Sequence, residues 1–134
     1  NDLDMFGEMR SCALLAKGVA QRADAAPAAT VLGMATLNGA KALGLGDRIG
    51  SLVTGKEADV ICVDLSAAAT QPVYDPVSQL VYATSRDQVS DVWVAGRQLL
   101  ADHQPLVADA PAILARAESW RARLSAARGS VAHD

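Results

Sequence analysis

Residues 28–43 form a predicted helix that has almost no polar face. Pro27 stands just ahead of the first turn, where proline is favoured, and Gly44 stands where helices commonly end. The apolar residues between them point in nearly every direction around the helix: Val31, Met34, Ala35, Leu37, Ala40 and Leu43. A helix that is apolar all round has to be covered on most sides. Any fold for this chain must therefore supply several neighbours for residues 28–43.

Two further helices are predicted from apolar residues at helical spacing. The first runs over about residues 5–21, with Asp2 or Asp4 available as its N-cap. The second begins at Pro111 and reaches about residue 128, with one apolar stripe made of Ile113, Ala117, Trp120 and Leu124. Pro76 can open a fourth, short helix, for which Asp75 would be the N-cap.

The strands predicted from the sequence are few and short. Residues 58–65 are β-branched and apolar, which predicts a strand whose central residues 60–63 are largely buried. Residues 89–101 predict a β-hairpin that turns at Ala95 and Gly96. Three or so short strands cannot cover the helix at 28–43, so the sequence is typical of a piece of a larger fold.

Composition narrows the class of protein. The 134 residues are 51% hydrophobic and 20% charged, which suits one ordered domain, and the net charge of -3 argues against a nucleic-acid binder. No apolar run reaches the length of a membrane span, so no membrane partner is expected. Cys12 and Cys62 are predicted to be buried thiols in a reducing cytoplasm, with a disulfide between them as the weaker alternative.

The stretch GSLVTGKE, residues 50–57, is one residue away from a phosphate-binding loop. Glu57 replaces the Ser or Thr of that loop, and the glycines follow a helix and precede a strand, whereas a phosphate loop follows a strand and begins a helix. We therefore interpret Gly50 and Gly55 as turn residues that permit positive φ.

No self-sufficient active site is visible in the sequence. His103 and His133 lack a second His or Cys at ligand spacing, so a surface position is favoured for both. Asp2 and Asp4 are too few oxygens for a cation site and suit helix capping better. The arginines of the last helix could face an acidic partner, although a solvated face is the commoner explanation.

The region from residue 35 to residue 65 resembles the C-terminal signature of the amidohydrolase superfamily. In that signature a helix ends in Leu-Gly-Leu, and a glycine-containing turn leads into a β-branched strand. The matching anchors are Ala35, Thr36, Gly39, Ala40, Leu43, Gly44, Leu45, Gly50, Leu52, Gly55, Lys56, Ala58 and Asp59. The hairpin at 89–100 is similar to the one that ends this family's small β domain, with Val92, Val94, Gly96 and Arg97 in place. Residues 1–17 and 74–84 resemble the branch that contains 5-methylthioadenosine/S-adenosylhomocysteine deaminases and N-ethylammeline chlorohydrolases.

This resemblance implies an α/β fold that is only partly present. Residues 1–46 would be the end of a (β/α)8 TIM barrel, and residues 47–107 would form part of a composite β-sandwich domain. Residues 108–134 would be a C-terminal helix and tail. The missing N-terminal part of the same enzyme would be the main partner, and a homo-oligomer is expected for this branch.

The resemblance also implies a chemistry that lies outside this chain. Such enzymes bind a divalent metal, typically zinc, whose activated water displaces ammonia or chloride from a small heterocyclic ring. The metal aspartate would lie just upstream of Asn1, which places no metal ligand and no catalytic residue in this segment. Asn1 and Asp2 are candidate substrate-binding residues at the mouth of the barrel, with an ordinary loop role as the alternative.

Two other interpretations stay open at this point. A free-standing, non-catalytic binding or assembly module could use the helix at 111–128 as its docking surface. Within the enzyme class, guanine deaminases, cytosine deaminases and imidazolonepropionase-like enzymes share the fold. The exact substrate, the choice between deamination and dechlorination, the metal and the oligomeric state are not encoded in these residues.

Overall fold

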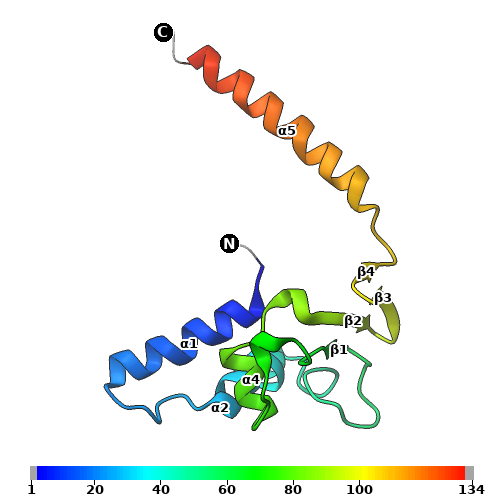
Figure 1. The fold of residues 1–134 in the computed structure, drawn as a ribbon. Coiled ribbons are helices and arrows are strands. Elements are labelled where there is room, and N and C mark those ends of the chain that lie inside the picture. The colour runs from blue at the N-terminus through cyan, green and yellow to red at the C-terminus, as the bar shows by residue number, and fades with distance from the viewer. Residues whose placement is uncertain (1–2, 132–134) are drawn as a thin grey trace. The chain divides into compact units, whose positions relative to one another are not determined.

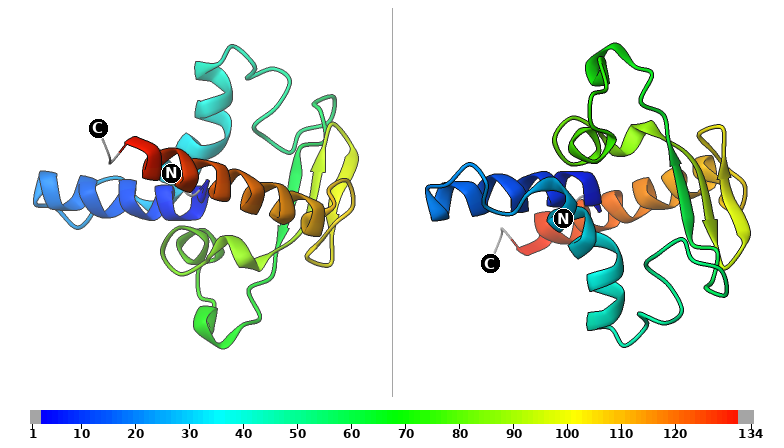
Figure 2. Two further views of the ribbon diagram at one scale, coloured as in Figure 1. Left: turned by 90° about the horizontal axis from the view of Figure 1, so that it is seen from above. Right: turned by 90° about the horizontal axis from the view of Figure 1, so that it is seen from below.

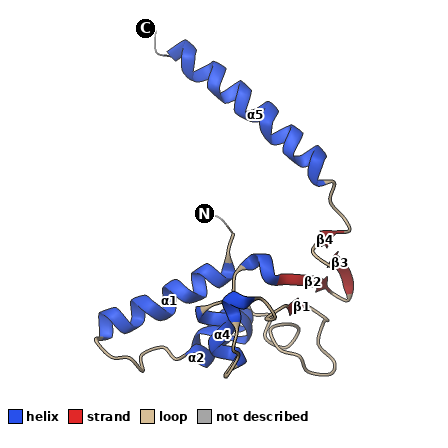
Figure 3. Cartoon of the chain, viewed as in Figure 1, coloured by secondary structure: helices blue, strands red, loops and turns tan. Residues whose placement is uncertain are grey.

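The computed structural model describes the backbone of residues 3–131 and the side chains of residues 3–127. The chain divides into two compact units, Asn1–Gln104 and Pro105–Asp134, which are described separately here. Helices dominate both, and the strands form one small sheet (Figure 1, Figure 3). The elements in chain order are α1 (Met5–Ala20), α2 (Ala28–Gly33), the π-helix η1 (Met34–Asn38), α3 (Gly39–Ala42), β1 (Val60–Val63), the 3₁₀ turn η2 (Ala68–Thr70), α4 (Pro76–Tyr82), the 3₁₀ turn η3 (Arg86–Gln88), β2 (Val89–Val94), β3 (Arg97–Ala101), β4 (Gln104–Pro105) and α5 (Ala110–Val131).

The helix predicted at the start of the chain is confirmed as α1, and Asp4 is its N-cap. The Asp4 carboxylate accepts hydrogen bonds from the backbone N–H groups of Phe6 and Gly7, both at 3.1 Å. These are two of the donors that a helix N-terminus leaves without an intrahelical partner. The helix ends at Ala20, where Gln21 takes the left-handed conformation.

The apolar helix predicted at 28–43 is confirmed as α2, η1 and α3, which follow one another without a break. Its middle is a π-helix, which the 3.6-residue pattern did not predict. The Thr36 hydroxyl donates to the Leu32 carbonyl at 2.7 Å within this stretch. π-Helical turns are rare and are found mostly where packing or function requires a wider turn.

The strands form one sheet in the order β1-β2-β3-β4, in which β1, β2 and β3 lie side by side as antiparallel neighbours (Figure 2). Val60 of β1 lies opposite Trp93 of β2. The predicted hairpin is confirmed between β2 and β3, where both turn residues have positive φ, 48° at Ala95 and 77° at Gly96. A two-residue turn of this kind follows the natural twist of the flanking strands. The predicted strand at 58–65 is confirmed over 60–63 only.

The core of the first unit lies where α1, α2 and α4 meet, and it is small. Its buried members are Phe6, Met9, Ala13, Ala28, Val31 and Val81. As predicted, Pro76 begins α4 and Asp75 is the N-cap, accepting from the Val77 N–H at 3.0 Å. The Ser78 hydroxyl, together with that N–H, holds the pKa of the Asp75 carboxyl below its ordinary value.

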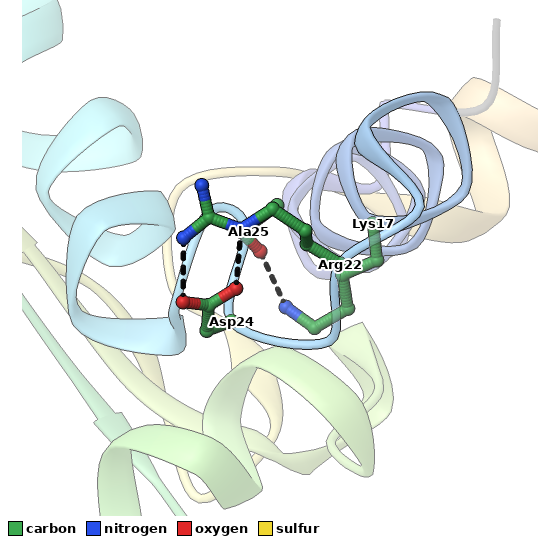
Figure 4. Close-up of polar contacts among 4 residues, drawn as sticks. All are labelled: Lys17, Arg22, Asp24 and Ala25. Carbon is green, nitrogen blue, oxygen red and sulfur yellow. Dashed lines mark hydrogen bonds and ion pairs between the residues drawn. The ribbon is translucent and has the colours of Figure 1, made fainter.

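Lys17 fixes the chain where it leaves α1 (Figure 4). Its Nζ donates to the carbonyl oxygens of Ala25 at 2.7 Å and Ala26 at 3.2 Å, and it lies 5.6 Å from the centre of the Tyr82 ring of α4. Arg22 forms a two-pronged ion pair with Asp24 on the outside of the same loop, with distances of 3.0 and 2.7 Å. The loop before α2 is therefore set by polar contacts, and the exposed ion pair adds little to stability.

The predicted burial of both thiols is wrong for this chain. Cys12 and Cys62 are exposed, and so is Ile61 beside Cys62 in β1. Cys12 lies on a side of α1 away from the buried Phe6, Met9 and Ala13. In β1 the neighbours Ile61 and Cys62 point to opposite faces of the sheet, and both are exposed, so the first unit covers neither face at these positions. A β-branched strand is buried only when polypeptide packs on it.

The helix predicted near the end of the chain is confirmed as α5, which begins one residue before Pro111. Ile113, Trp120 and Leu124 of the predicted stripe are exposed, and so is Leu114 outside it, so the apolar residues of α5 are not confined to one face. Across residues 3–131, none of the helices combines the length and the apolar character needed to cross a bilayer.

Candidate functional site

The segment that joins α3 to β1, residues 44–59, is here called the glycine turn. It begins with a C-terminal helix cap in which the Leu45 N–H donates to the Ala40 carbonyl at 2.8 Å, while the Gly44 N–H donates to Lys41 at 3.0 Å. Gly44 has a φ of 73°, as this cap requires. The helix therefore ends abruptly, and the chain reverses direction toward the sheet.

Gly50 is the point of closest approach between the glycine turn and the preceding helix. Its φ is 87°, and a Cβ placed there would lie 2.7 Å from the Ala40 Cβ and 2.9 Å from the Leu37 Cα. Only a residue without a side chain fits this contact. Ala40 is itself buried, so two small residues let the turn lie directly on the helix.

Lys56 and Glu57 hold the glycine turn together from within. The Lys56 Nζ donates to the carbonyl oxygen of Gly46, and to that of Ile49 at 3.2 Å. The Glu57 carboxylate accepts from the Arg48 guanidinium, with an Nε distance of 2.9 Å. The lysine that would bind phosphate in a nucleotide loop therefore donates to backbone carbonyls instead. Gly50 and Gly55 have the positive φ predicted for turn residues.

Asp59 connects the end of the glycine turn to the β2–β3 hairpin, which is distant in sequence. Its Oδ1 accepts from the Ala95 N–H at 2.7 Å, and the Ala58 carbonyl accepts from the Gly96 N–H at 3.0 Å. Both donors belong to the tight turn between β2 and β3. The two regions of the sequence that carry the family resemblance therefore meet in space, and Ala58, Asp59 and Gly96 of the matching residues form the junction.

An open hollow of about 600 Å³, here called the apolar groove, lies beside this junction. Its walls come from the first turn of α1, from η1 and α3, from the glycine turn and from β1. The large side chains on it are Met5, Met34, Leu43, Ile49, Leu52 and Ile61. Leu43 is 75% exposed and Leu52 is 80% exposed. A hollow with this lining is suited to receiving apolar side chains.

A second hollow of about 250 Å³ shares Met5 and Met34 with the apolar groove and extends along α1 to Cys12. The two hollows form a continuous apolar surface between α1 and the helix at 28–42. Few polar groups line them, so the surface is suited to packing apolar side chains and offers no set of groups for acid–base chemistry.

No group of three or more metal-ligating side chains was found within the described part of the chain. His103 lies in the turn between β3 and β4, where its backbone N–H donates to the Ser90 carbonyl at 2.9 Å. Asn1, Asp2 and His133 lie outside the described residues. The described residues therefore do not fit a metal centre, and no ligand is assigned among them.

Arg10 was not singled out from the sequence, and it crosses from α1 to the end of α4. Its Nη2 donates to the Thr84 carbonyl at 2.6 Å. Its Nε is buried and has no acceptor among the described residues. Buried donors of this kind are nearly always paired in native proteins. No spacing rule marks such a residue, because its partners are distant in sequence.

Comparison with known proteins gives a consistent result. Residues 1–99 match the family model described as the amidohydrolase family. A 5-methylthioadenosine/S-adenosylhomocysteine deaminase from Teredinibacter turnerae is 48% identical over 128 residues, which is 96% of this chain and 29% of that protein. The chain thus spans less than a third of the length of this relative.

Two solved structures also resemble the chain. An adenosine deaminase from Xanthomonas campestris with bound zinc has a TM-score of 0.89 and 52% identity, covering 91% of this chain and 28% of that one. The atrazine chlorohydrolase of Arthrobacter aurescens, complexed with zinc, has a TM-score of 0.78 and 30% identity, covering 85% and 25%.

Proposed function

This chain belongs to the amidohydrolase family, and from that premise we propose that it is the C-terminal portion of a metal-dependent hydrolase. The whole enzyme would deaminate, or dechlorinate, a purine-like or triazine-like ring. The observation that carries this proposal is the close likeness of the chain to a deaminase that contains zinc. The first relatives are deaminases of adenosine-type compounds, so deamination is the preferred reaction.

The chain would contribute structure to this enzyme. Residues 1–46 would complete the barrel, residues 47–107 would belong to the composite β domain, and residues 108–134 would form the terminal helix and tail. The apolar groove would receive polypeptide from the missing N-terminal part, which would cover Met34 and Ile61.

The metal, for which zinc is proposed, would be held by residues outside this segment. When bound, it would supply an activated water for attack on the ring carbon. The Asp4 cap would position the start of α1, which follows the barrel mouth, and the glycine turn would position β1 beside the hairpin. Asn1 and Asp2 remain candidates for contact with substrate there. If the Asn1→Ala enzyme has an unchanged kcat/KM, Asn1 does not contact the substrate.

The proposal is tested by assaying the whole enzyme for ammonia release. We expect release from 5-methylthioadenosine or S-adenosylhomocysteine, loss of activity after treatment with a chelator, and recovery when zinc is added back. Atrazine is tested as the alternative substrate, and its dechlorination is measured as the release of chloride. Activity on none of these compounds, or activity that survives complete metal removal, would contradict the proposal.

We also propose a cellular location and an oligomeric state for the enzyme. A cytoplasmic location and a homo-oligomer are expected from the resemblance. Fractionation of cells that express the tagged enzyme and sedimentation of the purified protein test these two points. A free-standing binding module is a weaker explanation, because such a module has to bury its own apolar faces and the described residues leave many of them exposed.

A further inference from the structure

β1 lies at one end of the sheet order, so the described residues give it a strand neighbour on one side only. Two hydrogen bonds show which of its backbone groups face β2. The Ala58 carbonyl accepts from the hairpin turn at 3.0 Å, and the Asp64 N–H donates to the last residue of η3 at 2.8 Å. Residues that bond to the partner alternate along an antiparallel strand with residues that do not. The backbone N–H and C=O groups of Ile61 and Val63 therefore point away from β2, and we call these groups the edge window.

The outward edge is closed on both sides of the edge window by the chain itself. Before the window, the Asp59 N–H donates to the Glu57 carbonyl at 2.9 Å. After it, the Leu65 carbonyl accepts from the Thr70 hydroxyl at 2.9 Å and from the Gln71 side-chain amide at 2.7 Å. The edge window is what remains, and no strand lies beside it among the described residues.

β1 is short, but the other features that protect an open strand edge are missing from it. The strand contains no charged residue and no proline. In its ladder with β2, Cys62 lies opposite Asp91 and Val63 lies opposite Val89. The residue that is skipped, Ser90, belongs to β2, so the bulge does not interrupt the outer edge of β1. The edge window is therefore a regular template for a further strand.

The edge window also adjoins the apolar groove, because the Ile61 side chain lines that groove. A residue directly opposite Ile61 on an added strand would have its Cβ about 4.5–5.5 Å away, on the same face of the sheet. Such a residue would lie over the groove, and an apolar side chain would suit it. One added strand would therefore satisfy the backbone groups of the window and cover part of the groove.

The backbone groups decide what kind of segment fits the window. Donors and acceptors at this spacing are matched by the edge of another strand. A second copy could offer its own window, but two residues on each side are far from the area that a stable dimer buries. The chain spans 29% of the length of the Teredinibacter turnerae relative, so most of that protein has no counterpart in residues 1–134. A segment of the same chain is favoured because covalent connection raises its effective concentration.

We propose that a strand from the missing N-terminal part of the same enzyme pairs with β1 at Ile61 and Val63. This inference rests on the proposed function, which supplies that part. The added strand would become the outer neighbour of β1, and the sheet would continue beyond the described residues. It would place an apolar side chain beside Ile61 and above the apolar groove.

The experiment measures hydrogen exchange at single backbone amides of the whole enzyme, by mass spectrometry with electron-transfer fragmentation. The Cys62 N–H faces β2 and serves as the internal reference. We expect the amides of Ile61 and Val63 to exchange at least about 100-fold more slowly than in the unfolded enzyme, as that of Cys62 does. Exchange of Ile61 and Val63 at the unfolded rate, beside a protected Cys62, would overturn the proposal.

Two variants separate the backbone contact from the side chain. Ile61→Pro and Ile61→Ala both shorten the side chain in the apolar groove, but only proline removes the N–H from the edge window. Proline is tolerated on an edge strand whose N–H faces solvent. With a strand paired there, we expect the whole enzyme to unfold at a lower urea concentration with proline than with alanine. Equal midpoints would show that the edge is open and would also overturn the proposal.

A photo-reactive benzoylphenylalanine at position 61 identifies the segment that pairs with β1. After irradiation of the whole enzyme we expect a product with the mass of one chain, joined to a peptide from before Asn1. That peptide should have apolar residues at alternate positions, as a strand beside the groove requires. A product of two chains, or one joined only within residues 1–134, would contradict the proposal.

Ammonia release from the same samples separates this inference from the proposed function. An enzyme that releases ammonia while Ile61 and Val63 exchange freely would keep its reaction and lose the added strand. Protected amides and a single-chain cross-link, without ammonia release from any tested substrate, would leave the strand pairing in place and refute the proposed reaction.

Discussion

The substitution Gly50→Ala is expected to lower the free energy of unfolding of the enzyme by about 3 kcal/mol. A side chain at a φ of 87° is strained by about 1–2 kcal/mol. The new Cβ would also lie 2.7 Å from the Ala40 Cβ, and such overpacking adds about 1–3 kcal/mol. Urea unfolding followed by circular dichroism measures the effect.

Gly55 provides the control for this prediction. Its φ is 94°, yet a Cβ there would meet no atom within 4 Å. Gly55→Ala should therefore show only the backbone strain, about 1–2 kcal/mol. The difference between the two variants isolates the contact of the glycine turn with the helix. Equal losses would mean that Gly50 is required for its φ alone, and that the close approach to Ala40 is unimportant.

The substitution Lys56→Met is expected to cost about 2 kcal/mol. Methionine keeps most of the volume but cannot donate to the carbonyl oxygens of Gly46 and Ile49. Hydrogen bonds from a charged donor contribute about 1.5–3 kcal/mol, and both acceptors would lose theirs together. The change in midpoint in the same urea titration measures the loss.

Lys41→Met is the matched control, because it removes the same charge from the neighbouring helix end. The Lys41 Nζ makes no hydrogen bond within the described residues, so we expect a change below about 0.5 kcal/mol. If the two lysine variants lost the same stability, the net charge of this region would matter and the carbonyl contacts of Lys56 would not.

The elements that the sequence predicted well are those specified by local chemistry. Pro27 and Gly44 mark the ends of the apolar helix, Pro76 with Asp75 begins α4, and Ala95-Gly96 forms the hairpin turn. Each signal acts through the backbone conformation of one or two residues, so it can be interpreted without knowledge of the rest of the fold.

The features that the sequence did not predict depend on contacts between distant residues. Burial of Cys62 requires a second layer over β1, which a β-branched run cannot itself supply. The π-helix in the middle of the apolar helix leaves the hydrophobic pattern almost unchanged. The contacts of Lys56 and Asp59 become visible only when the glycine turn is folded against α3 and the hairpin.

The exposed thiols beside the apolar hollows and on the sheet offer the most direct test of the proposed larger enzyme. Cys12 lines the smaller hollow and Cys62 lies in β1, and both thiols are exposed in this chain. Ile61 lines the apolar groove, so the neighbouring Cys62 side chain lies on the other face of the sheet. If the N-terminal part of the enzyme covers the hollows and also packs on that other face of β1, both thiols will be protected from alkylation in the native enzyme. Mass spectrometry of the labelled peptides measures the rate at each position.

We predict that Cys12 and Cys62 of the whole, active enzyme will react at least about 100-fold more slowly than in the unfolded enzyme, because labelling then requires a local opening. The isolated segment of residues 1–134 should react rapidly at both positions. Alkylation of both thiols in the native enzyme at the rate of the unfolded chain would show that neither the hollow at Cys12 nor the sheet face at Cys62 is covered, and would contradict the proposal.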